Sequence, residues 1–127
     1  MKIITKNLLW LLLLCPITAF SQISMIGEWT FEVPDENGNM IPVKLKIDEK
    51  AYSVDWGMDG TAEVEGNYML EGDQATIWDI KGENACPDVK GIYKVEVTDT
   101  SMTMTRVKDD CEGRGGPEGK MVFQRAK

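Results

Sequence analysis

Apolar and polar side chains alternate along most of this chain, which is the pattern of β-strands that bury one face. The apolar positions are odd-numbered in residues 28–33 and 41–48, and even-numbered in residues 62–71. No stretch after the first 21 residues keeps a helical period for longer than one turn. The pattern therefore predicts an all-β protein.

One predicted strand is long and another is ambiguous. Residues 62–71 keep a single register, which predicts one strand bent at Gly66, because a glycine inside a strand often marks a bend at a barrel corner. Residues 75–80 carry apolar side chains on both faces, so their pattern does not assign the inner face.

Short turn sequences separate the strands. Asn37-Gly38 is a strong hairpin signal, because both residues tolerate a positive φ. Counting strands between such turns predicts eight, joined in sequence order. Closing the sheet removes its edges, so we expect a small antiparallel up-and-down β-barrel, with a β-sandwich as the alternative. The interior of such a barrel either holds one small ligand or is filled by its own aromatic residues.

The first 21 residues have the features of a secretory signal peptide. Lys2 and Lys6 precede a short apolar run that ends before Pro16. We predict cleavage near Ser21/Gln22, with residues 22–127 forming the barrel domain and the protein secreted or periplasmic. Lipidation at Cys15 is the less favoured alternative. The apolar run is too short to span a bilayer, so no transmembrane segment is expected.

Charge and cysteine content narrow the function. The net charge of −7 disfavours binding to nucleic acids. Once the signal segment is removed, Cys86 and Cys111 remain as an even pair, which predicts a disulfide in an oxidising compartment. The chain has no histidine, so catalytic arrangements that need one are excluded. We expect no enzyme activity, cofactor or metal site.

Several motifs resemble those of lipocalin-like (calycin-type) barrels. Gly27-Glu28-Trp29 resembles their G-x-W signature, and Arg125 stands where those families place an arginine across the tryptophan. The stretch from Cys86 through Gly91-x-Tyr93 to Asp110-Cys111 also resembles small secreted bacterial members. The resemblance implies that Gly27, Trp29 and Arg125 close one end of the barrel. The chain lacks the long helix that larger lipocalins carry before the last strand, which argues against a large ligand cavity.

A small secreted barrel without catalytic residues is compatible with two non-enzymatic functions. The first is binding of a small hydrophobic ligand, with Arg106 available to an anionic head group. The second is interaction with a protein partner, such as inhibition of a protease through residues 22–26. Residues 113–116 are expected to form a mobile loop. The residues predicted to contact the ligand are Trp29, Tyr52, Trp56, Tyr68, Tyr93, Met104, Arg106 and Phe123.

Overall fold

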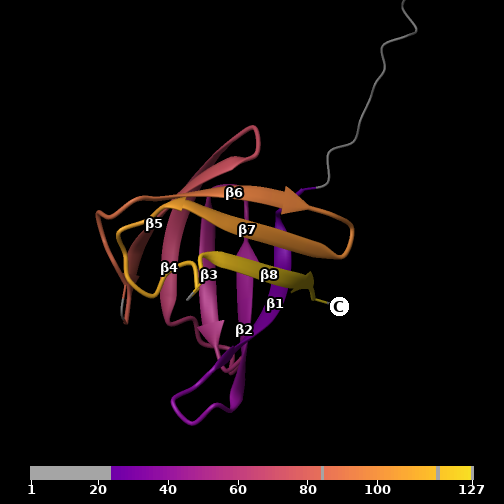
Figure 1. Ribbon diagram of the computed structural model, residues 1–127, viewed down its shortest axis with the longest axis vertical. Coiled ribbons are helices and arrows are strands. Elements are labelled where there is room, and N and C mark those ends of the chain that lie inside the picture. The colour runs from indigo at the N-terminus through magenta and orange to yellow at the C-terminus, as the bar shows by residue number, and fades with distance from the viewer. Residues whose placement is uncertain (1–23, 84, 117, 127) are drawn as a thin grey trace, which may run out of the picture.

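The protein is a closed antiparallel β-barrel in which each strand pairs with the next in the sequence. This computed structural model describes residues 24–126 except 84 and 117 (Figure 1). The predicted signal peptide lies outside the described residues. The eight strands are β1 (Gly27–Pro34), β2 (Met40–Ile47), β3 (Ala51–Trp56), β4 (Val64–Glu71), β5 (Gln74–Gly82), β6 (Gly91–Val97), β7 (Ser101–Lys108) and β8 (Lys120–Arg125). The predicted fold class is confirmed, and the sandwich alternative is excluded.

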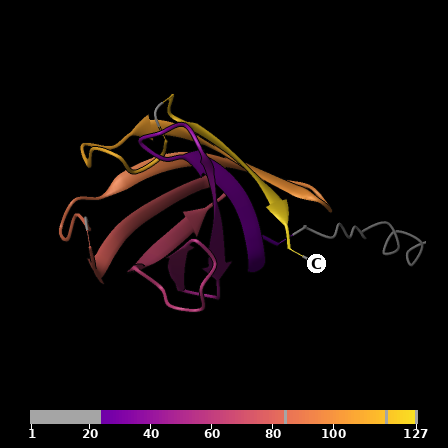
Figure 2. The same ribbon diagram turned by 90° about the horizontal axis from the view of Figure 1, so that it is seen from below.

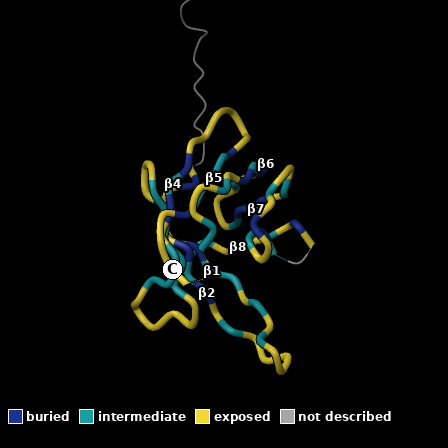
Figure 3. Tube along the Cα trace, turned by 90° about the vertical axis from the view of Figure 1, so that its left-hand side faces the viewer, coloured by how far each residue is buried: buried dark blue, intermediate teal, exposed yellow. Residues whose placement is uncertain are grey.

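The alternation in the sequence corresponds to the two faces of the barrel wall. In β2, Val43, Leu45 and Ile47 are buried, while Lys46 between them is exposed. Figure 3 shows the buried positions along the strands and the exposed ones in the connecting loops. The core is made of the inward side chains, because an antiparallel strand presents alternate residues to opposite faces.

Strand β4 is a single strand, as predicted, although it begins at Val64 and not at residue 62. Its register with β5 shifts between Glu65 and Gly66, which pair with Lys81 and Asp79, so the extra residue of this irregularity is Ile80 of β5. Gly66 has no room for a side chain, because a Cβ there would overlap the Tyr52 ring and lie 2.5 Å from the Trp78 carbonyl oxygen. The close approach of β3 and β5 therefore explains why this position is a glycine, while the bend predicted here stays a prediction.

The structure assigns the ambiguous strand. In β5, Ala75, Ile77 and Asp79 are buried, and Ile80 is 51% exposed. The odd-numbered residues therefore face inward. One consequence is that a carboxylate, Asp79, lies inside the barrel with only 5% of its surface exposed.

One end of the barrel is closed by the residues that carry the lipocalin-like resemblance. The Arg125 guanidinium lies 4.2 Å from the centroid of the Trp29 ring, and Trp29 is fully buried. The Trp29 indole N–H donates to the Met25 carbonyl at 2.9 Å, which holds the chain before β1 against the same end. Gly27 has a φ of 141°, and a Cβ there would lie 3.2 Å from Arg125 Nη1.

The two ends of the barrel differ in the length of their connections. At the Trp29 end the strands are joined by residues 48–50, 72–73 and 98–100. At the other end they are joined by the longer segments 35–39, 57–63, 83–90 and 109–119. In Figure 1, β6, β7 and β8 run across the direction of β2, β3 and β4, and Figure 2 shows the barrel from below. Within the described part of the chain, no helix has the length and apolar character that crossing a membrane requires.

Candidate functional site

The interior of the barrel contains a cavity of about 920 Å³. This volume contradicts our expectation that the missing helix would leave little room. The cavity walls are apolar over most of their length, and the charged lining residues come from β5, β7 and the segments 83–90 and 109–119. We call this charged end the mouth of the cavity. Its apolar wall consists of Met25, Phe31, Val33, Pro34, Leu45, Ile47, Tyr52, Val54, Trp56, Val64, Tyr68, Ile77, Met104, Met121 and Phe123.

Most of the residues predicted to contact a ligand line this cavity. They are Tyr52, Trp56, Tyr68, Met104, Arg106 and Phe123. The other two lie elsewhere. Trp29 packs beneath Arg125 at the closed end. Tyr93 is fully buried, and its hydroxyl donates to Asp109 Oδ2 at 2.5 Å.

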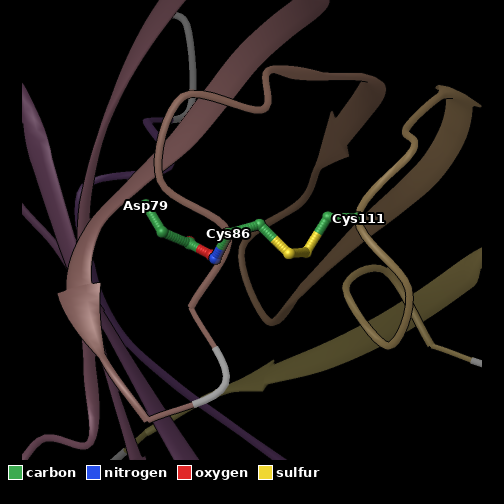
Figure 4. Close-up of side chains that lie close together, drawn as sticks. All are labelled: Asp79, Cys86 and Cys111. Carbon is green, nitrogen blue, oxygen red and sulfur yellow. A yellow bond between two sulfur atoms is a disulfide. The ribbon is translucent and has the colours of Figure 1, made fainter.

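Asp79 is a buried carboxylate at the mouth that sequence reasoning did not identify. Its Oδ1 accepts from the Tyr52 hydroxyl at 2.5 Å, and its Oδ2 accepts from the Cys86 N–H at 2.9 Å. Figure 4 shows Asp79 directed at the backbone of Cys86 beside the disulfide. Burial raises the pKa of the Tyr52 hydroxyl, and the hydrogen bond to Asp79 raises it further. Tyr52 is therefore a neutral hydrogen-bond donor at physiological pH.

Arg114 connects two carboxylates across the mouth. Its Nε and Nη2 donate to the two oxygens of Asp109 at 2.7 and 2.8 Å. Its Nη1 lies 3.3 Å from Asp79 Oδ2, and only 10% of the Arg114 side chain is exposed. The same Nη2 donates to the Val89 carbonyl at 2.7 Å, so that Arg114 also holds segment 83–90. Our expectation of a mobile loop at residues 113–116 is wrong for Arg114, because these partners anchor it inside the barrel.

The surroundings of Asp109 determine its charge. Burial by itself would raise its pKa, but the hydrogen bonds from Arg114, Tyr93 and the Cys111 N–H lower it below the ordinary value. Burial, followed by the hydrogen bond to Asp109, raises the pKa of Tyr93 to about 12. Asp109 is therefore ionised and Tyr93 neutral at physiological pH, which fixes donor and acceptor in this cluster.

Arg106 lines the cavity, and part of its guanidinium is used by the protein itself. Its Nη2 donates to the carbonyls of Arg114 and Gly116 at 3.0 and 2.9 Å. Arg106 of β7 thus holds the backbone of the 109–119 segment, while the side chain of Arg114 connects the same segment to Asp79 and to the Val89 carbonyl. This bonding reduces the capacity of Arg106 to bind an anionic head group.

The predicted disulfide between Cys86 and Cys111 is present. It joins the 83–90 and 109–119 segments at the mouth, and its Cα atoms are 5.9 Å apart. Each cysteine N–H also donates to a carboxylate of the charged cluster, Asp79 or Asp109. A structural disulfide is compatible with an extracellular or periplasmic location.

Two groups of potential metal ligands occur among the described residues. The first is Asp79 with Cys86 and Cys111, whose sulfurs bond to each other and are not available as thiolates. The second is Asp55, Asp59 and Glu63. Its carboxylates accept backbone N–H groups from residues 56–61, so they stabilise the turn after β3.

The residues that sequence reasoning missed had only weak signals. Asp79 has the same odd parity as Ala75 and Ile77, but a lone aspartate in a strand with two apolar faces does not show which side it occupies. Arg114 follows the disulfide cysteine closely in the sequence, yet its partners lie 35 and 5 residues away, and only the fold brings them together.

Comparisons with protein-family models, with curated proteins and with solved structures gave no match. The lipocalin-like resemblance therefore stays a prediction from the sequence, and function has to be argued from the geometry of the cavity.

Proposed function

We propose that the protein binds one small, apolar, uncharged molecule inside the barrel. The observation that carries this proposal is the cavity of about 920 Å³ with its apolar wall. Ligand sites in proteins typically have volumes of about 300–1,000 Å³ and are mostly apolar with a few polar groups. Protein cores are normally filled to crystal-like density, so a hollow of this size gives up packing contacts that an apolar ligand would restore.

The charges at the mouth indicate which ligands are favoured. The lining contains five carboxylates, on Asp79, Glu83, Asp109, Asp110 and Glu112, against two guanidinium groups, on Arg106 and Arg114. Arg114 is paired with Asp79 and Asp109, and Arg106 holds backbone carbonyls. An anionic ligand would add negative charge to a lining that already has an excess of it. We therefore favour a neutral ligand over the anionic one that Arg106 alone would suggest.

The chain before β1 supports this proposal better than it supports the inhibitor alternative. Met25 is 5% exposed and lines the cavity, and the Ser24 carbonyl accepts from Arg125 Nη2 at 3.3 Å. Within the described part of residues 22–26, Met25 is therefore packed into the barrel, while Ser24 and Ile26 are exposed. Protease inhibition that uses Met25 would require this side chain to leave the cavity.

The proposal is tested by binding of the neutral probe N-phenyl-1-naphthylamine, measured by fluorescence. Val54 lines the cavity, so Val54→Trp should fill part of it and weaken binding at least about tenfold, a change of roughly 1.4 kcal/mol. Val107 is 62% exposed on β7, so Val107→Trp is the matched control and should bind like the wild type.

Thermal melts of both variants show whether each is folded, and Val54→Phe is the smaller substitution if Val54→Trp does not fold. Native mass spectrometry of the protein from its own source then reports a retained ligand by its mass. Failure of the folded wild type to bind the probe, or equal affinities for the Val54 and Val107 variants, would refute the proposal.

A further inference from the structure

The barrel wall is weakest between β1 and β8. These strands pair only at Trp29 with Arg125 and at Thr30 with Gln124. Every other neighbouring pair of strands is in register over at least four positions. Strand β1 nevertheless continues to Pro34, and β8 begins at Lys120. We call the unpaired part the seam, formed by residues 31–34 of β1 and residues 120–123 of β8.

A second hollow, of about 720 Å³, lies over the seam. Its lining includes residues from both strands and Pro42 and Met58 beside them. The residues that it shares with the barrel cavity are Phe31, Val33, Pro34, Gly116 and Met121. These shared residues therefore face both hollows, which places the two hollows next to each other at the seam.

The backbone of the seam offers little resistance to opening. The Ala126 N–H donates to the Glu28 carbonyl at 2.9 Å, and hydrogen-bonded positions alternate along antiparallel strands. The next hydrogen-bonded pair is therefore Thr30 with Gln124, which lies within the register of β1 and β8. The pair after it would be Glu32 with Val122, and the register ends before that pair. Separation of the strands at the seam thus breaks no ladder hydrogen bond.

Two aromatic rings hold the inner side of the seam. Phe31 and Phe123 are in edge-to-face contact with centroids 4.6 Å apart, and both line the barrel cavity. Phe123 is 2% exposed and fixed in the core, whereas Phe31 is partly buried and also lines the outer hollow. Of the two rings, Phe31 is therefore the one that faces both hollows.

The mouth is more strongly restrained than the seam. Segment 109–119 is attached there by the disulfide, by the ion pairs of Arg114 and by the hydrogen bonds of Arg106. We propose that the ligand enters and leaves the cavity through the seam, with the Phe31 ring as its gate. This inference rests on the proposed function.

The experiment locks the seam without changing the cavity. Glu32 and Val122 are both exposed and line only the outer hollow. The double variant Glu32→Cys with Val122→Cys is joined by a short bis-maleimide, and mass spectrometry verifies the cross-link. The matched control is the same variant with each thiol capped by N-ethylmaleimide, which adds the same chemistry without the bridge.

Stopped-flow fluorescence with N-phenyl-1-naphthylamine gives the association and dissociation rate constants. We expect both constants to fall at least about tenfold in the cross-linked protein, with an unchanged Kd, because a blocked route raises the barrier in both directions. Equal rate constants in the cross-linked and capped proteins would overturn the seam route and leave the proposed function intact. Lack of probe binding by the wild type would overturn both.

Discussion

Removal of the Arg114 charge should strongly destabilise the barrel. Its side chain is 10% exposed, and its partners Asp79 and Asp109 are 5% and 0% exposed as side chains. Arg114→Met leaves two buried carboxylates without their cation. Removing one partner of a buried ion pair typically costs about 3–5 kcal/mol, a large fraction of the roughly 5–15 kcal/mol that stabilises a domain.

The assay is urea unfolding followed by tryptophan fluorescence, with the free energy of unfolding extrapolated to water. A matched control is Lys81→Met, since Lys81 pairs with Glu65 at 3.6 Å on the surface, where the two side chains are 69% and 49% exposed. Exposed pairs of this kind contribute about 0–1 kcal/mol. Adding Asp79→Asn and Asp109→Asn to Arg114→Met should recover much of the loss, because the uncompensated charges disappear.

The same cluster predicts a dependence on pH. The folded pKa of Asp109 is lower than its ordinary value, so its stabilising contribution is complete above the unfolded pKa of about 3.9. That contribution is lost as the pH falls through the lower folded pKa. The difference in stability between wild type and Arg114→Met should therefore shrink below about pH 4. A loss in Arg114→Met no larger than that in Lys81→Met at neutral pH would refute this reasoning.

Four further outcomes are expected. A neutral long-chain alcohol should bind more tightly than the carboxylate of equal chain length in calorimetry, and the reverse order would contradict the charge argument for the mouth. Cys111→Ser should lower the free energy of unfolding by about 3–4 kcal/mol, because it opens a closed loop with a sequence separation of 25, and should leave binding specificity unchanged; an equal melting temperature without reductant would count against this. Burial raises the pKa of each of the three tyrosines, so at about pH 11 the folded protein should show less tyrosinate absorbance than the urea-unfolded chain. Arg125→Met should lower the free energy of unfolding, measured by heat or urea, by about 0.5–2 kcal/mol, because the contact with the Trp29 ring is lost. An unchanged free energy of unfolding would mean that this contact does not stabilise the closed end of the barrel.

Much of the fold follows from the sequence, because the side-chain period of a strand is two. In β2 the alternation of apolar and polar residues separated inward from outward positions. In β4 the same alternation continued without interruption and predicted a single strand. Only two cysteines, Cys86 and Cys111, follow residue 21, so that the prediction of a signal peptide left one pairing, and this pairing is present. Short turns between the strands left the up-and-down barrel as the preferred topology.

Tertiary structure decided what lies inside the barrel and where its wall is weak. The alternation of residues along a strand predicts which face a side chain occupies. It does not predict how far that side chain reaches across the interior, so the sequence pattern gave no volume for the cavity of about 920 Å³. Asp79 and Arg114 carry opposite charges 35 residues apart, and only the folding of β5 beside segment 109–119 makes them partners. The seam has the same origin, because the pairing of the first strand with the last depends on how the whole barrel closes.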